Sequence, residues 1–242
     1  MREYAIALGG SVGDVAGTMA AALEALETAG GRVLRTSRVY RTAPIGRASG
    51  PFLNAAAAIT FDGSAAELLA VCQMLERNCG RRPTQRWDDR PVDIDLILGP
   101  EPVTTPTLRL PHPWAHLRRF VLEPLCELAA DRVLPATGRT VADVAAHWRR
   151  PLLRVQFEDA VPPVDSEQVR PVCDHADLVI GQAAAAGWPP RANADDVPLP
   201  DLWQRRDAIL LGVLDCPRPL DGIRLPNAVT PCGPPDEAKR PA

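Results

Sequence analysis

The chain has 242 residues, of which 46% are hydrophobic and 24% are charged, and its formal net charge is −3. That composition is typical of a globular protein, and the small negative charge gives no electrostatic signature of binding to nucleic acid or to an anionic membrane. No apolar run is long enough to span a membrane, and the first residues lack the layout of a signal peptide. The six cysteines include no C-x-x-C pair, so we expect reduced thiols, no zinc site and a cytoplasmic protein.

The first third of the chain predicts a strand, a helix and two more strands. Residues 4–8 form a short apolar strand, and the turn after it leads into a helix that Asp14 caps and a Gly-Gly pair ends. The alternating residues 32–42 predict the next strand, which a Gly/Pro loop follows. A further strand is expected at 52–61, although its alanines also allow a helix.

The middle of the chain continues this order with helices and one apolar strand. Ser64 and Glu67 predict a capping box for a helix that ends at Gly80. An arginine-rich loop and an apolar strand come next, and a helix is expected around residues 120–130. Thr140 is placed to begin a short last helix.

The amino-acid composition of the sequence changes near residue 150. The last 92 residues hold 15 of the 26 prolines and contain only two plausible elements, at 174–187 and 201–214. Such a composition favours a linker or a poorly ordered surface over a second folded core. We therefore predict a catalytic domain at 1–150 and a proline-rich extension at 151–242, partly ordered at most, that the chemistry does not need. The alternative is that residues 201–214 dock as an amphipathic helix.

The apolar strand carries two carboxylates on one face. In the stretch "VDIDLIL", Ile94, Leu96 and Leu98 alternate with Asp93 and Asp95, so the two aspartates share the opposite face. A buried, unpaired aspartate is unfavourable by several kcal/mol, so the pair needs cations, hydrogen bonds or water. One interpretation is a solvated face paired with arginines. The other is a magnesium site that also binds phosphate oxygens.

The loop before this strand favours the phosphate interpretation. Arg81, Arg82, Arg86 and Arg90 surround Trp87 within ten residues. Guanidinium groups suit a polyphosphate, and an indole can cover an aromatic ring. A solvated surface or an RNA contact would also explain a basic loop, but the overall acidity argues against RNA. Arginines facing a carboxylate pair would suit a magnesium–ATP site.

Several motifs together resemble one known family. "ALGGSVGD", "SRVYRTAPIG", "FLNAA", "LERNCGR", "RW..R..DIDLIL" and "LPHPWAHLRRFVLEPL" follow in order over about residues 4–147. They are similar to the pyrophosphokinases that act on 6-hydroxymethyl-7,8-dihydropterin in folate synthesis. The resemblance implies an α+β fold, a ferredoxin-like antiparallel sheet with packed helices, with which the order of predicted elements agrees. It also implies that the pterin hydroxymethyl oxygen attacks the β-phosphorus of ATP and that AMP leaves.

The resemblance also implies roles for individual residues. Asp93 and Asp95 would ligate two magnesium ions, and Arg81 and Arg90 would act on the phosphates. The implied pterin-binding residues are Thr42, Pro44, Phe52, Asn54 and Phe120. The implied ATP-binding residues are Gln73, Glu76, Trp87, His112 and Arg118, with Trp87 closing over the site. Without the resemblance, Phe52 and Phe120 would be interpreted as core residues, His112 as a turn residue and Glu76 as a solvated charge.

Three departures from the family pattern keep other functions open. Ser11 stands where the family has asparagine, Pro83 where it has a second loop arginine, and Asp88 and Asp89 where it has Gly-Pro. Like charges near ATP should weaken its binding. A catalytically weakened pterin-binding relative, acting as a regulatory or partner module, is one alternative; a transferase acting on another hydroxyl is the second. P-loop and dinucleotide fingerprints are missing. The expected partners are ATP and the pterin, and we expect neither nucleic acid nor membrane to bind. A monomer is one possible oligomeric state.

Overall fold

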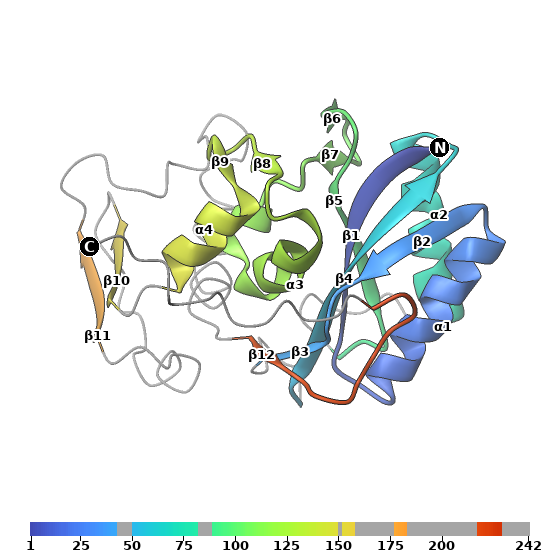
Figure 1. Ribbon diagram of the computed structural model, residues 1–242, viewed down its shortest axis with the longest axis horizontal. Coiled ribbons are helices and arrows are strands. Elements are labelled where there is room, and N and C mark those ends of the chain that lie inside the picture. Colours follow the sequence, from blue (N-terminus) through green and yellow to red (C-terminus); the bar gives the residue numbers. More distant parts are fainter. Residues whose placement is uncertain (43–49, 82–88, 150–151, 158–176, 183–216, 229–242) are drawn as a thin grey trace, which may run out of the picture.

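The computed structural model describes residues 1–42, 50–81, 89–149, 152–157, 177–182 and 217–228 (Figure 1). Its helices and longer strands are β1 (Arg2–Gly10), α1 (Val15–Thr28), β2 (Gly31–Thr36), β3 (Tyr40–Thr42), β4 (Phe52–Phe61), α2 (Ala65–Asn78), β5 (Asp93–Leu98), α3 (Arg119–Ala129), α4 (Val141–Trp148), β10 (Leu152–Phe157) and β11 (Asp177–Gln182). The short elements are β6 (Val103–Thr104), β7 (Arg109–Leu110), the 3-10 helix η1 (Ala115–Leu117), β8 (Val133–Leu134), β9 (Arg139–Thr140) and β12 (Arg218–Pro219).

A six-stranded sheet forms the centre of the fold, and its strand pairs are all antiparallel. The strand order is β12-β3-β4-β1-β5, and β2 pairs with β4 beyond the end of β3. Helices α1 and α2 lie on one side of the sheet and α3 and α4 on the other (Figure 1). The predicted α+β fold, an antiparallel sheet with packed helices, is confirmed.

The three predicted helix starts are confirmed by their caps. Asp14 accepts a hydrogen bond from the backbone N–H of Gly17 at 3.0 Å. At α2, Ser64 and Glu67 make both bonds of the capping box. At α4, Thr140 accepts from the backbone N–H of Asp143. Each cap satisfies backbone N–H groups that the first helical turn cannot pair internally.

The predicted strand at 32–42 is interrupted in the structure. It divides into β2 and β3 because Ser37, which is fully buried, inserts its hydroxyl into the pairing with β4. The Ser37 hydroxyl accepts from the backbone N–H of Ala56, and the Ser37 backbone N–H donates to the Ala56 carbonyl. The segment at 52–61 is strand β4, so the helical alternative for its alanines is wrong.

The prediction for β5 is correct for the aspartates and wrong for Leu98. Ile94 and Leu96 pack with α1 and α2, whereas Leu98 joins Ile97 in the core beneath α3 and α4. The register between β1 and β5 shifts at this point, because Ala5 lies opposite Leu98 and the next residue lies opposite Leu96. Such a bulge breaks the strict alternation of side chains.

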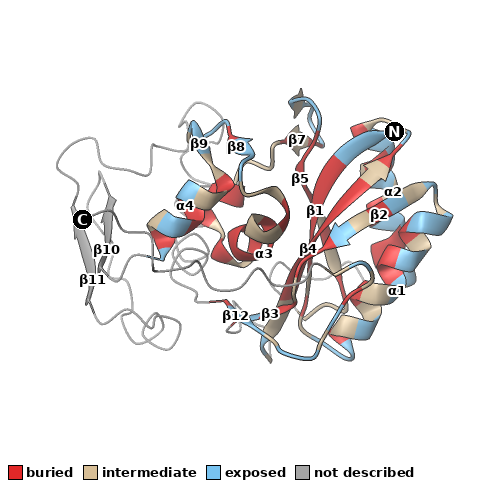
Figure 2. Ribbon diagram, viewed as in Figure 1, coloured by how far each residue is buried: buried red, intermediate tan, exposed pale blue. Residues whose placement is uncertain are grey.

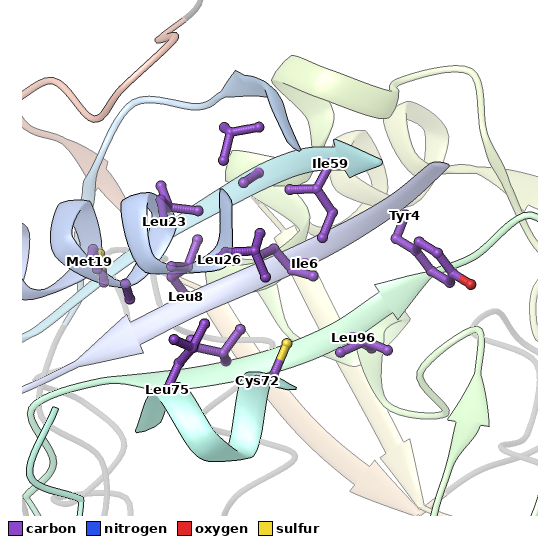
Figure 3. Packing of buried hydrophobic residues seen from close by; sticks show 14 of the residues in the cluster. Tyr4, Ile6, Leu8, Met19, Leu23, Leu26, Ile59, Cys72, Leu75 and Leu96 are labelled. Carbon is purple, nitrogen blue, oxygen red and sulfur yellow. The ribbon is translucent and has the colours of Figure 1, made fainter. Parts of the chain in front are cut away.

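The two main apolar cores lie on the two sides of the sheet (Figure 2). The larger packs Ile6 and Leu8 of β1 against Met19, Leu23 and Leu26 of α1, and it includes Cys72 and Leu75 of α2 (Figure 3). The smaller core packs Ala5 and Ala7 against Leu122 and Leu125 of α3 and Trp148 of α4. Both cores hold β1 and β5 in place, and those strands carry the candidate site.

Part of the proline-rich region is also described. Strand β10 pairs with β11 in parallel, so the region predicted at 174–187 contains a strand. Residues 217–228 run along the sheet edge, where β12 pairs with β3. Residues 201–214 lie outside the described residues, and the boundary at 150 stays a prediction. No helix in the described part is both long and apolar enough to cross a membrane.

Candidate active site

A pocket of about 300 Å³ opens between the sheet and the start of α3. It is lined by residues from β1, β3, β4 and β5, from the ends of the arginine-rich loop, and from the segment leading into α3: Ala7, Leu8, Gly9, Thr42, Phe52, Asn54, Arg81, Arg90, Asp93, Asp95, His112, Arg118, Phe120 and Val121. Most of the site residues predicted from the sequence are therefore brought together. Pro44 and Trp87 lie outside the described residues.

The register of β1 explains why the two aspartates face open space. Gly9 lies opposite Asp93 and Ala7 lies opposite Asp95, so the strand beside the carboxylates carries almost no side-chain bulk. Gly9 also faces Asn54, since a Cβ there would lie 3.3 Å from the amide oxygen. The sequence interpretation missed these pocket residues, although the small residues of "AIALGG" were a usable signal.

Arginines from three segments pair with the carboxylates. Arg81 Nη1 lies 2.5 Å from Asp93 Oδ1, and Arg90 Nη1 lies 2.8 Å from Asp93 Oδ2. Arg118 Nη1 lies 3.5 Å from Asp95 Oδ2, which is a weaker contact. The ion pairs of the first interpretation are present, but the groups that form them line a pocket rather than a solvated strand face.

The Asp95 carboxyl lies in an environment that disfavours its charge. Burial raises its pKa, and so does the negative charge of Asp93, while Arg118, Arg81 and Arg90 lower it by less in total. The side chain is 41% exposed because it faces the pocket, so solvent in the pocket moderates the effect. A positive charge beside the two aspartates would stabilise the ionised pair.

This donor set fits magnesium. Carboxylate oxygens are the ligands that this hard cation prefers, and magnesium in phosphate sites usually takes one or two of them and completes its shell with phosphate and water. Within the described residues, no three His, Cys, Asp or Glu side chains gather around a common point for a metal. Among the described residues, Asp93 and Asp95 would therefore be the magnesium ligands, and the substrate would supply the remaining ligands.

Glu76 lies behind the pocket rather than in it. It is buried on α2, its Oε1 accepts from the backbone N–H of Ile94 at 2.7 Å, and it lies 2.5 Å from Arg81 Nη1. Burial raises its pKa to about 7, with a further contribution from the charge of Asp93. Gln73 is exposed on the same helix and does not line the pocket. The buried stripe of α2 includes Glu76 and excludes Gln73, so the two residues differ in exposure, and their expected contact with a nucleotide stays a prediction.

The other end of the pocket combines aromatic rings with an amide. Asn54 Nδ2 donates to Thr42 Oγ1 at 3.0 Å, and both side chains are buried. Phe52 and Phe120 line the same end from β4 and α3, and the Arg118 guanidinium lies 5.8 Å from the Phe120 ring centre. A flat heterocycle fits such a site, since rings can cover its faces while the amide binds its edge.

His112 lines the pocket, and its imidazole ring is neutral. Its Nδ1 accepts from the backbone N–H of Trp114 at 3.1 Å. Burial and then the positive charge of Arg118 lower its pKa to about 3. At neutral pH the imidazole can therefore offer a hydrogen bond to a ligand but no positive charge.

Two departures from the family pattern contact each other. The Ser11 hydroxyl donates to Asp89 Oδ1 at 3.0 Å and accepts from the backbone N–H of Arg90 at 3.2 Å. The Ser11 backbone N–H donates to the Arg90 carbonyl at 2.9 Å. Asp89 is thus bound to the turn after β1, which ties the end of the arginine-rich loop beside the pocket. Asp88 lies outside the described residues.

Comparison with known proteins gives a consistent result. Residues 5–130 match the family model of 7,8-dihydro-6-hydroxymethylpterin-pyrophosphokinase (HPPK). The chain is 40% identical over 130 residues to the 2-amino-4-hydroxy-6-hydroxymethyldihydropteridine pyrophosphokinase of Porphyromonas gingivalis, covering 51% of this chain and 88% of that protein. It is 41% identical over 149 residues to the enzyme of that name from Methylorubrum extorquens, covering 60% and 92%. It is also 34% identical over 148 residues to the "Folate synthesis bifunctional protein, mitochondrial" of Arabidopsis thaliana, covering 60% of this chain and 26% of that protein.

Proposed function

This chain belongs to the 7,8-dihydro-6-hydroxymethylpterin-pyrophosphokinase family, and from that premise we propose how its pocket performs the reaction. The enzyme transfers the pyrophosphoryl group of ATP to the hydroxymethyl oxygen of 6-hydroxymethyl-7,8-dihydropterin and releases AMP, a step of folate biosynthesis. One observation carries the assignment to this pocket: a carboxylate pair with three arginines at one end, and an amide with two aromatic rings at the other.

The aromatic end binds the pterin. Phe52 and Phe120 cover the ring faces, and the Asn54–Thr42 pair binds the polar edge. Because both polar side chains are buried and bonded to each other, they hold a fixed geometry before the substrate arrives. Preorganisation of this kind lowers the entropy lost on binding. Pro44 completes this end in our proposal.

The charged end binds the triphosphate. Arg81, Arg90 and Arg118 contribute positive charge where the leaving AMP and the transferred group share negative charge, which lowers the barrier to attack on the β-phosphorus. Asp93 and Asp95 would hold two magnesium ions, which when bound neutralise phosphate charge and orient the reacting oxygens. Glu76 holds Arg81 in place, and His112 donates from Nε2 as a neutral ring, since its Nδ1 accepts from the Trp114 backbone. Gln73 contacts the nucleotide in our proposal, and Trp87 closes over the site.

The two alternatives are not favoured by this arrangement. A catalytically weakened relative would be supported by aspartates that repel ATP, but Asp89 is bound to Ser11. A transferase acting on another hydroxyl would not need the Asn54–Thr42 pair in a pocket that two aromatic rings also line. The carboxylates and arginines required for phosphoryl chemistry are all in the pocket.

An assay of AMP formation tests the proposal. Protein with magnesium and ATP should release AMP only when the hydroxymethyl-dihydropterin is added, and Asp95→Asn serves as the inactive control. Pterin binding by calorimetry without AMP formation would support the weakened relative instead. AMP released with other hydroxyl compounds but not with the pterin would support the other transferase.

A further inference from the structure

Twelve residues from the proline-rich half, 217–228, lie along the outer edge of the catalytic sheet, and we name them the C-terminal strap (Figure 1). Strand β12 of the strap pairs antiparallel with β3, with Arg218 opposite Arg41 and Pro219 opposite Tyr40. The other end of the strap forms a parallel bridge between Ala228 and Thr36 of β2. The strap therefore contacts the edge on both sides of the interruption between β2 and β3.

Hydrogen bonds fix the strap to this edge. They are Leu220 N to Val39 O at 2.8 Å, Thr36 N to Asn227 O at 2.9 Å, Thr36 Oγ1 to Pro226 O at 2.8 Å and Asn227 Nδ2 to Val33 O at 2.8 Å. Backbone groups at a sheet edge need partners, and an edge without them invites pairing with other chains. The strap supplies these partners from within the same chain.

The strap is also part of the larger core. Leu225 is 4% exposed and belongs to the cluster that α1 and α2 cover, and Leu220 and Ile223 pack against that cluster. The strap turns at Gly222, whose φ of 84° favours glycine, and Asn227 adopts a φ of 55°. Glycine and asparagine tolerate this left-handed region best, so the sequence of the strap suits its observed path.

The strap lies directly against the strand that enters the pterin end of the pocket. Strand β3 has only three residues and ends at Thr42, which lines the pocket and whose hydroxyl oxygen accepts a hydrogen bond from Asn54 Nδ2. On its inner side β3 is held by β4, with Thr42 opposite Phe52. At its outer edge β3 pairs with the strap alone among the described residues, while the hydroxyl of Tyr40 donates to Glu127 of α3.

We propose that the C-terminal strap is a positioning element for the pterin site, fixing β3 and through it Thr42 and Asn54. The inference rests on the pterin-binding role proposed above for this end of the pocket. It assigns a positioning role to a segment that begins about 70 residues beyond α4, since Arg218 follows Trp148 by that interval. The charged end of the pocket is built on β5, the ends of the arginine-rich loop and the start of α3, whereas β12 pairs with β3, so the KM for ATP should not depend on the strap.

The test uses the full chain with Leu225→Asp, which places a charge in the core and releases the strap. Its matched control is Arg224→Asp, which introduces the same residue at the neighbouring, exposed position. The expected result is a KM for the pterin raised by about tenfold or more, an unchanged KM for ATP, and a control close to wild type. An equal rise in the KM for both substrates, or an unchanged pterin KM with the strap released, would overturn the proposal. Release is verified by faster hydrogen exchange of the Leu220 amide.

A milder variant protects the test against misfolding. Asn227→Ala removes the bond to the Val33 carbonyl and disfavours the left-handed conformation without burying a charge. It should raise the pterin KM in the same direction by a smaller factor, and no change despite faster Leu220 exchange would count against the strap. If the wild-type chain binds pterin and ATP but forms no AMP, the proposed function is refuted. The strap is then tested separately, by whether Leu225→Asp raises the dissociation constant of the pterin and leaves that of ATP unchanged.

Discussion

Replacing each aspartate of the pair by asparagine should move stability in opposite directions while abolishing turnover in both cases. Asp95→Asn removes a charge that burial and Asp93 disfavour, since these effects raise the Asp95 pKa more than the arginines lower it. A carboxyl group whose pKa is raised in the folded state opposes folding at neutral pH, because its charged form is favoured in the unfolded chain. Asp93→Asn instead removes the charged partner of both Arg81 and Arg90.

The magnitudes follow from exposure and contacts. The Asp95 side chain is 41% exposed, so screening limits the gain from Asp95→Asn to below about 1 kcal/mol. For a domain of this size that is a rise in Tm of up to about 3 °C. Asp93 accepts charged hydrogen bonds at 2.5 and 2.8 Å with its side chain 27% exposed. Weakening both should destabilise the protein by about 1–3 kcal/mol and lower Tm by about 3–10 °C.

Thermal unfolding without nucleotide, together with AMP formation, measures both consequences. Turnover should fall by about 100-fold or more in each variant, because each loses a proposed magnesium ligand. Pterin affinity without nucleotide should change little, since Asn54 and Thr42 are untouched. Near-normal turnover in Asp95→Asn would refute its role as a ligand. A Tm that falls equally in both variants would refute the electrostatic reasoning.

Three further outcomes are expected. Asn54→Leu should raise the pterin KM by about 10–100-fold and leave the KM for ATP unchanged in steady-state assays, because a buried hydrogen-bonding partner is lost. In a double-mutant cycle of thermal stability, Ser11→Ala and Asp89→Asn should show a coupling of about 1 kcal/mol, and additive effects would show that their bond is absent in solution. Burial lowers the pKa of His116 to about 4, so the unfolded chain binds the proton more tightly and stability falls as pH drops from about 6.5 toward 4. In urea unfolding, His116→Leu should reduce the stability difference between pH 7 and pH 5 by about 2 kcal/mol.

Local signals in the sequence predicted much of the fold. Asp14, Ser64 and Thr140 each marked a helix start, because a cap acts on residues only three positions away. The interruption at Ser37 and the changed side of Leu98 were missed, since both arise from pairing with distant strands. Register between strands far apart in sequence leaves no local trace.

In the candidate site, too, contacts between residues near in sequence were predictable and contacts between distant residues were not. Asp93 with Arg81 and Arg90 was predictable as a cluster, because these residues lie within twelve positions of one another. The bond between Ser11 and Asp89 spans 78 positions, and the sequence showed only two separate departures from the family pattern. The strap was missed because its prolines and turn residues have the composition of a linker, whereas its contacts come from Leu225 and a few backbone groups.

The late position of the strap has a consequence for synthesis of the protein. A ribosome that has completed α4 must add about 70 residues before Arg218 exists, which takes roughly 4–14 s at about 5–20 residues per second. During that interval β2 and β3 can fold against β4 while their outer edge has no strap to pair with. Nascent chains in a polysome would then present matching, unprotected edges to one another, and pairing between them competes with correct completion. Slow codons between α4 and the strap should therefore increase aggregation during translation without changing the stability of the finished enzyme.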